Sequence, residues 1–259
     1  MPHCHKLPPA PAVAYGDHPD QVANLHLPAA DGPFPAVALI HGGFWRAGWD
    51  RTMLTPLARE LASRGFAAWN VEYRRVGQAG GGWPGTFADV AAAVDHLAGL
   101  EAVDDARVVT LGHSAGGHLA LWLAGRARAP AAPGGPPRIR PRGVVGLAAV
   151  CDLISGHADG LGNGAVAELL GGGPADVPER YASSSPAALS PLGVPQLLVH
   201  GGLDEIVPVA QSRGYAEGSR ARGDDVELVE LPDADHFDLI DPGHAAWGVV
   251  IDRLPALAS

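Results

Sequence analysis

Residues 108–118 read Val108-Val109-Thr110-Leu111-Gly112-His113-Ser114-Ala115-Gly116-Gly117-His118. An apolar, β-branched run ends here in Gly-x-Ser-x-Gly, and an Ala- and Leu-rich helical pattern follows at once. A strand, a sharp turn and a helix in this order present a serine hydroxyl for nucleophilic attack. Gly112 and Gly116 lack the Cβ atoms that would crowd such a turn. Ser114 is therefore the candidate nucleophile.

Buried strands and amphipathic helices alternate on both sides of this stretch. Strands are expected over residues 22–27, 37–40, 66–72, 107–111, 144–149, 197–200 and 226–231, and helices over 53–64, 86–97, 114–126, 209–222 and 244–254. This alternation predicts an α/β fold with a mostly parallel sheet of about eight strands and helices on both faces. No linker separates two cores, so residues 1–259 are expected to form a single domain.

Two segments do not follow the alternation. Residues 1–17 are expected to be a flexible tail, in which His3-Cys4-His5 could bind a metal but fits a disordered segment better. Residues 153–191 contain Gly, Ser and Pro clusters around a short helical piece at 165–170. We expect this second segment to be a lid-like excursion over the sheet edge.

Composition limits the possible partners and compartment. The 259 residues include 28 acidic and 18 basic side chains, for a formal net charge of -10, which disfavours nucleic acid. The longest apolar stretch, residues 144–151, is too short to span a bilayer, and the N-terminus lacks a secretory signal pattern. Cys4 and Cys151 are the only cysteines, which is typical of a reduced, cytoplasmic protein. Oligomeric state is left open.

A nucleophilic serine needs a basic histidine and an acid that orients it. In this architecture the order along the chain is serine, acid, histidine. The strand at 197–200 leads into Asp204, and the strand at 226–231 leads into His236. The carboxyl ends of parallel strands meet at one edge of a sheet, so these side chains are expected to converge on Ser114. Asp152, which follows the strand at 144–149, is the alternative acid.

Other histidine and acidic residues near these strand ends are expected to have structural roles. Glu205 is expected to point away from the site, and His200 to be a buried histidine within its strand. His244 fits the start of the last helix. His113 and His118 flank the nucleophile, where packing is the expected role.

Acyl transfer also needs N–H donors for the negative charge that develops on the carbonyl oxygen. One expected donor is the amide of Ala115, directly after the nucleophile. The second comes from the loop after the strand at 37–40, which reads His-Gly-Gly-Phe-Trp over residues 41–45. Its two glycines allow the backbone to turn its amides inward, and Gly43 and Phe44 are the candidate donors.

The loop also carries large aromatic side chains. Phe44, Trp45 and Trp49 could wall a substrate pocket, and Trp45 and Trp49 are the candidate substrate-binding residues. Packing beneath the 153–191 segment is the alternative, because large aromatic residues are mostly found in cores.

Together these motifs resemble the α/β-hydrolase superfamily over nearly the whole chain. The His-Gly-Gly-Phe-Trp form of the oxyanion loop resembles the branch of kynurenine formamidases (arylformamidases) and related small carboxylesterases. The Gly-His-Ser-Ala-Gly-Gly-His, His-Gly-x-x-Asp-x-x-Val-Pro and Asp-His-Phe segments also match. The resemblance implies a catalytic triad of Ser114, Asp204 and His236, with oxyanion donors from Gly43 and Phe44.

The resemblance also implies a reaction. It is that of a serine hydrolase that cleaves small carboxylic esters through an acyl-enzyme, without a metal or another cofactor. An arylformamidase acting on N-formyl amides is the alternative. A ligand-binding protein and an acyltransferase on the same fold are less favoured, since no member of the triad is missing. The expected partner is a small ester or amide, with neither nucleic acid nor membrane.

Overall fold

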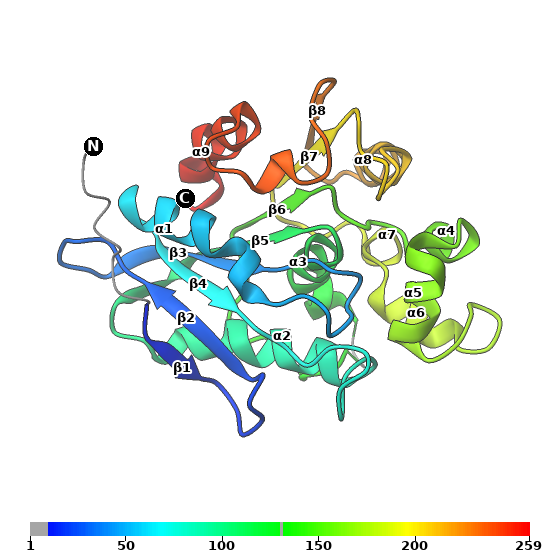
Figure 1. The fold of residues 1–259 in the computed structure, drawn as a ribbon, viewed down its shortest axis with the longest axis horizontal. Helices are drawn as coiled ribbons and strands as arrows, with labels where there is room; N and C mark the ends of the chain where they lie inside the picture. Colours follow the sequence, from blue (N-terminus) through cyan, green and yellow to red (C-terminus); the bar gives the residue numbers. More distant parts are fainter. Residues whose placement is uncertain (1–9, 130–131) are drawn as a thin grey trace.

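The computed structural model describes residues 10–129 and 132–259. Eight strands of these residues form one sheet in the order β1-β2-β4-β3-β5-β6-β7-β8 (Figure 1). The pairs β1·β2 and β2·β4 are antiparallel and all others are parallel, which confirms the expected mostly parallel sheet. The strands are β1 Ala12–Ala14, β2 Val22–His26, β3 Phe34–Ile40, β4 Ala67–Val71, β5 Val103–His113, β6 Gly143–Leu147, β7 Gln196–Gly201 and β8 Val226–Leu231.

Helices cover both faces of the sheet (Figure 1). They are α1 Thr55–Ser63, α2 Gly85–His96, α3 Ala115–Gly125, α4 Leu153–Ala158, α5 Leu161–Leu170, α6 Pro178–Ser184, α7 Pro186–Leu189, α8 Ala210–Ala221 and α9 Ala245–Leu257. Successive strand residues point to opposite faces. In β3, Val37 and Leu39 belong to the core cluster that contains residues of α1 and α9, while Ala38 and Ile40 belong to the cluster that contains residues of α2, α3 and α8. The central strands are therefore apolar on both faces.

Strand register brings the candidate site together. Ile40 at the end of β3 lies beside Gly112 near the end of β5, and His113 lies beside Leu147 at the end of β6. The chain leaves β3 for β4 on one side and returns with β5 on the other. Ligands of open α/β sheets bind at such a reversal, beyond the carboxyl ends of the strands. The loop at 41–45 and Ser114 both lie there.

The N-terminal segment differs from the expected flexible tail. Residues 1–9, including His3-Cys4-His5, lie outside the described residues. Residues 12–14, however, form β1, which pairs antiparallel with β2. A strand of three residues is too short to show a periodic pattern, and its order depends on the edge of the sheet beside it.

The 153–191 segment folds into α4, α5, α6 and α7, which cluster at one end of the molecule (Figure 1). It is tied to the loop after β3, because Arg46 forms a 2.7 Å ion pair with Glu168 in α5. Gly162 packs against the ring of Phe44, where an added Cβ would lie 2.4 Å from Cδ1. These contacts place the segment beside the candidate site, and its action as a lid stays a prediction.

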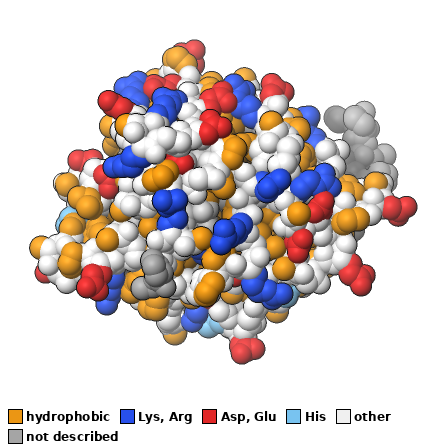
Figure 2. Space-filling view, turned by 180° about the vertical axis from the view of Figure 1, so that it is seen from behind, with side chains coloured by type: hydrophobic (Ala, Val, Ile, Leu, Met, Phe, Trp, Pro, Cys, Tyr) orange, Lys and Arg blue, Asp and Glu red, His pale blue; other side chains and the backbone are white. Residues whose placement is uncertain are grey.

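Among the described residues, no helix combines the length and the apolar character needed to cross a bilayer. Acidic, basic and apolar side chains are interspersed on the face seen in Figure 2. Cys151 is buried with a free thiol.

Candidate active site

Ser114 lies at the tip of a strained turn between β5 and α3. Its φ of 57° and ψ of −120° are unfavourable for a residue with a side chain. A Cβ on Gly112 would lie 2.0 Å from the carbonyl oxygen of Gly116, and one on Gly116 would lie 2.0 Å from that of Ile40. Only glycine fits at these two positions. The turn holds Ser114 where a strand–turn–helix nucleophile is expected.

Asp204 and His236, the predicted acid and base, are hydrogen-bonded to each other. His236 Nδ1 lies 2.7 Å from Asp204 Oδ2. The other carboxylate oxygen of Asp204 accepts hydrogen bonds of 2.8 Å from the amides of Ile206 and Val207. These bonds fix the carboxylate just past the end of β7, so that it orients the imidazole of His236.

The environment of Asp204 keeps its carboxyl ionised. Burial alone would raise its pKa, but hydrogen bonds from His200, His236 and the Val207 amide outweigh burial and hold the pKa well below the usual range. An ionised Asp204 favours the tautomer of His236 with a proton on Nδ1, which leaves Nε2 free to accept one.

Ser114 and His236 line the same cavity. The hydrogen bonds among the described residues do not include one between Ser114 Oγ and His236 Nε2. Contacts of this kind are commonly long in enzymes without substrate and tighten when the complex forms. The arrangement thus brings all three predicted triad residues to one place, with the acid–base bond already formed.

The loop at 41–45 presents unused amides beside Ser114. Gly43 and Phe44 both have positive φ, at 104° and 53°. Within the described chain, no backbone carbonyl accepts a hydrogen bond from the N–H of Gly43, Phe44 or Ala115. Ala115 is also the first residue of α3, whose N-terminus carries partial positive charge. The three predicted oxyanion donors are therefore free to bind an anion.

The cavity over Ser114 is open to solvent, and its empty space measures about 340 Å³ with the solvent at its mouth included. It is lined by Gly43, Phe44, Trp49, Met53, His113, Ser114, Ile206, His236 and Phe237. No carboxylate, lysine or arginine is among these residues. The rings of Trp49 and Phe237 stack with centroids 6.2 Å apart and are 47% and 43% exposed, so they form the mouth of the cavity.

The two candidate substrate-binding tryptophans lie in different places. Trp49 lines the cavity and covers Gly43, where an added Cβ would lie 2.4 Å from the indole Cγ. Trp45 is fully buried and donates a 3.1 Å hydrogen bond from Nε1 to the carbonyl oxygen of Ala115. Trp45 therefore packs behind the turn that carries Ser114 instead of lining the cavity.

The alternative acid lies away from the pair. Asp152 caps α4 by accepting a 2.9 Å hydrogen bond from the Ile154 amide, and it lines a separate cavity beside α8. His244 similarly caps α9, accepting from the Ala246 amide at 3.2 Å. Neither Asp152 nor His244 lines the cavity over Ser114.

Two histidines that were expected only to pack contact the acid–base pair directly. His113 donates from Nε2 to the carbonyl oxygen of His236 at 2.9 Å, and the two rings lie 4.4 Å apart. Burial, with the charge of His236 as a smaller cause, lowers the pKa of His113 to about 3, so its ring is neutral. His200 Nε2 lies 3.3 Å from Asp204 Oδ2. One signal for these contacts was present in the sequence: His113 lies in the Gly-His-Ser segment and His200 in the His-Gly-x-x-Asp segment, each close to a predicted site residue.

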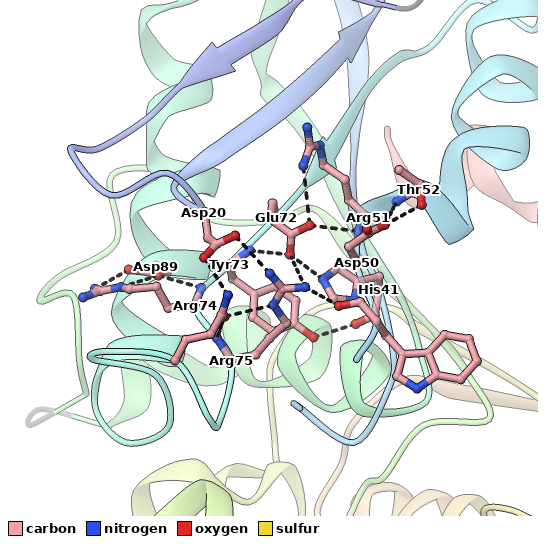
Figure 3. A network of polar contacts seen from close by, with 12 residues as sticks. Asp20, His41, Asp50, Arg51, Thr52, Glu72, Tyr73, Arg74, Arg75 and Asp89 are labelled. Carbon is pink, nitrogen blue, oxygen red and sulfur yellow. Dashed lines mark hydrogen bonds and ion pairs between the residues drawn. The ribbon is translucent and has the colours of Figure 1, made fainter. Parts of the chain in front are cut away.

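A network of buried polar side chains behind the loop at 41–45 was not anticipated either (Figure 3). Its central carboxylate is Glu72, which directly follows β4 and accepts hydrogen bonds from His41 and from the Arg51 amide. In the sequence, Glu72 is only a charged residue at the end of an apolar run, and no local pattern predicts its partners.

Comparison with known proteins finds a family and several relatives that resemble this chain. The sequence model of the BD-FAE family matches residues 24–217. Esterase LipC of Mycobacterium tuberculosis is 28% identical over 253 residues, covering 88% of this chain and 60% of LipC. A probable isoprenylcysteine α-carbonyl methylesterase of Arabidopsis thaliana, ICMEL1, is 30% identical over 119 residues, covering 42% of this chain and 23% of the relative. The chain thus spans less than two thirds of the length of either relative.

Solved structures share the fold. Esterase 2 of Thermogutta terrifontis, with butyrate bound, has a TM-score of 0.75 at 24% identity, covering 97% of this chain and 94% of that one. Esterase B of Lactobacillus rhamnosis has a TM-score of 0.79 at 22% identity, covering 95% and 83%. The fold is the α/β-hydrolase fold, as expected. The arylformamidase branch stays a prediction.

Proposed function

Because the chain belongs to the BD-FAE family, we propose that it is a serine hydrolase that cleaves small, uncharged carboxylic esters. The observation that carries this proposal is the 2.7 Å bond between His236 and the ionised Asp204 at a cavity shared with Ser114. The esterase names of the relatives support the same reaction class.

The geometry supports a two-step acyl transfer. Ser114 Oγ attacks the ester carbonyl while His236 Nε2 takes its proton, and Asp204 stabilises the imidazolium that forms. The oxyanion accepts hydrogen bonds from the free amides of the loop at 41–45 and of Ala115, each worth about 3–4 kcal/mol in the transition state. His236 then protonates the leaving alcohol. A water activated by His236 finally hydrolyses the acyl-enzyme.

The cavity lining supports an uncharged substrate. N-formylkynurenine carries an ammonium and a carboxylate, and burying either without a partner costs several kcal/mol, on the order of the penalty for an unpaired ion. The side chains that line the cavity supply no countercharge. A short acyl ester meets no such penalty, so the ester reaction is favoured over hydrolysis of this formamide.

The test compares hydrolysis of 4-nitrophenyl acetate and butyrate with that of N-formylkynurenine. We expect turnover of the esters and labelling of Ser114 by a fluorophosphonate, both lost in Ser114→Ala. Ser63→Ala, at an exposed position at the end of α1, is the matched control and is expected to behave as the wild type. Retained turnover in folded Ser114→Ala would refute the assignment, and faster cleavage of N-formylkynurenine would move it to the formamidases.

A further inference from the structure

Three neighbouring side chains, Glu72, His41 and Tyr73, form a buried cluster directly behind the oxyanion loop at 41–45 (Figure 3). His41 Nε2 donates to Glu72 Oε1 at 2.9 Å, and His41 Nδ1 donates to the carbonyl oxygen of Gly42 at 2.8 Å. Tyr73 stacks on the His41 ring with centroids 4.4 Å apart, and its hydroxyl donates to the His41 carbonyl oxygen at 2.8 Å. His41 is thus held on its edge, its face and its backbone.

The hydrogen bond from His41 to the Gly42 carbonyl oxygen fixes the orientation of one candidate oxyanion donor, the N–H of Gly43. The carbonyl of Gly42 and the N–H of Gly43 belong to one planar trans peptide unit, in which they point in opposite directions. A carbonyl held toward the His41 ring therefore turns the Gly43 N–H away from that ring, and Gly43 lines the cavity over Ser114. Rotation of this single peptide would remove the donor without changing the rest of the loop.

Both ring nitrogens of His41 meet groups that can only accept, a carbonyl oxygen and a carboxylate. In each of these two bonds the ring nitrogen is therefore the donor, and the Glu72 carboxylate is the stronger of the two acceptors. Burial alone would raise the pKa of Glu72, but the hydrogen bond and charge of His41, the Arg51 amide and Arg75 outweigh burial and lower it. Glu72 is therefore ionised, which strengthens the hydrogen bond that it accepts from His41.

Glu72 also contacts the chain that follows the loop at 41–45. Its second oxygen accepts a 3.0 Å hydrogen bond from the amide of Arg51. Arg75, 3.4 Å from Glu72, in turn donates to the carbonyl oxygen of Trp49. One carboxylate therefore holds both ends of the segment that carries the candidate donors and the mouth of the cavity.

We propose that Glu72 is a positioning residue for the oxyanion hole, acting through His41 to keep the Gly43 N–H directed at the substrate oxygen. This role of Glu72 rests on the proposed function, because an oxyanion hole is needed only if Ser114 performs acyl transfer. Glu72 does not touch the substrate. Glu72 contributes to stabilising the transition state, in which negative charge develops on the carbonyl oxygen of the substrate.

The chain offers a matched control in Asp89. Asp89 is also a fully buried carboxylate of the same polar network, but it lies at the opposite end from His41 (Figure 3). Its partners are Arg74, with bonds of 2.6, 2.8 and 2.9 Å, and Gln21 at 2.7 Å. Replacing either carboxylate by its amide removes a buried charge, but only Glu72 contacts the oxyanion loop.

The experiment compares Glu72→Gln with Asp89→Asn on a short 4-nitrophenyl ester. Glutamine can still accept from His41 Nε2 through its amide oxygen, but a neutral acceptor holds the ring less strongly than a carboxylate does. The ring is then less firmly fixed, and its bond to the Gly42 carbonyl oxygen no longer holds the Gly42–Gly43 peptide in one orientation. We expect kcat to fall about 10- to 100-fold, the order of one lost oxyanion donor, with KM changed less than about threefold. Asp89→Asn is expected to change kcat less than about threefold, as for a site outside the transition-state contacts.

A double-mutant cycle separates positioning from general destabilisation. His41→Asn should lower kcat as Glu72→Gln does, and the double variant should lose little more than the worse single variant, because both act through one peptide. Equal losses in Glu72→Gln and Asp89→Asn, additive losses in the cycle, or a raised KM with unchanged kcat would each overturn the proposal.

If Glu72→Gln does not fold, as judged by its thermal midpoint and near-UV circular dichroism, His41→Asn and Tyr73→Phe test the same cluster. A lower kcat with retained KM in these variants supports the proposal, and an unchanged kcat in both overturns it. Ser114→Ala distinguishes the two failures. If Ser114→Ala retains activity, the proposed function fails, whereas an inactive Ser114→Ala beside a fully active Glu72→Gln refutes only the role of Glu72.

Discussion

Among the residues that the structure describes, two short, buried carboxylate–histidine pairs stand out, besides the longer contact of His200 with Asp204. Asp204 and His236 are 2.7 Å apart, and Glu72 and His41 are 2.9 Å apart. A second ring packs 4.4 Å from each histidine, His113 on His236 and Tyr73 on His41. The pairs differ at the other ring nitrogen. Among the described residues His236 Nε2 has no hydrogen-bond partner, whereas His41 Nδ1 is bonded to a backbone carbonyl oxygen.

This difference shows how one chemical pair can serve two purposes. A histidine with one nitrogen on a carboxylate and the other free can take up and release a proton, as a general base must. A histidine with both nitrogens bonded to protein acceptors has no nitrogen left for a nucleophile or a substrate, and it is suited to fixing a backbone orientation. The two roles, general base and backbone positioning, are therefore separated by the partner of the ring nitrogen that does not contact the carboxylate.

The strongest test of this contrast replaces each histidine by asparagine. His236→Asn should lower kcat by about 10⁴-fold or more, because it removes the general base. His41→Asn should lower it only about 10- to 100-fold, since the base and nucleophile remain. Steady-state kinetics on a short ester measure both, and equal losses would contradict the separation of roles.

Replacing the acid of the first pair should come next in size. Asp204→Asn keeps the shape of the site but favours the wrong tautomer of His236, so kcat should fall about 10³- to 10⁴-fold. Asp152→Asn, which removes the rejected alternative acid, is the control and should keep nearly full activity. The opposite pattern of activities would exchange the assignments of Asp204 and Asp152.

Both pairs should also affect stability in acid. The pKa values of Asp204 and Glu72 are lower in the folded protein than the ordinary values of 3.8 and 4.5. Each ionised carboxylate therefore stabilises the fold near neutral pH, and this stabilisation is lost as the pH falls below about 4.5 toward the folded pKa. Urea unfolding can be measured between pH 3 and 7 in steps of ~0.5 pH units. As the pH is lowered, the free energy of unfolding should fall less steeply in Asp204→Asn and Glu72→Gln than in the wild type. Parallel curves would mean that the two carboxyls are not shifted.

The smallest expected effect concerns the ring beside His236. His113→Phe keeps the packing but removes the hydrogen bond to the His236 carbonyl oxygen. The loss of one such bond, worth about 1 kcal/mol, should lower kcat roughly 3- to 10-fold without changing KM. An unchanged kcat would mean that His113 only fills space.

Much of the fold follows from local pattern. The apolar runs that become β3 to β8 and the amphipathic stretch of α1 follow directly from side-chain periodicity. β1 does not, because its three residues become a strand only by pairing with β2. The short helices between residues 153 and 191 were also only partly predicted, since the Gly and Pro in that segment interrupt its periodicity.

In the candidate site, too, some features follow from local sequence pattern and others depend on the tertiary structure. Gly-x-Ser-x-Gly identifies Ser114, and position after a strand selects Asp204 and His236. Trp45 and Trp49, however, lie on the same loop and look alike in sequence. Only the turn of the backbone, with positive φ at Gly43, Phe44 and Trp45, sends Trp45 into the core and leaves Trp49 at the cavity.

By itself, the sequence determined the order of strands and helices, the nucleophile turn and the glycines that this turn needs. These features depend on contacts among residues close together in the chain. Only the tertiary structure decided that Glu72 meets His41, because these residues come from neighbouring strand ends 31 positions apart. Such pairs are made by strand register and burial, which no local pattern encodes.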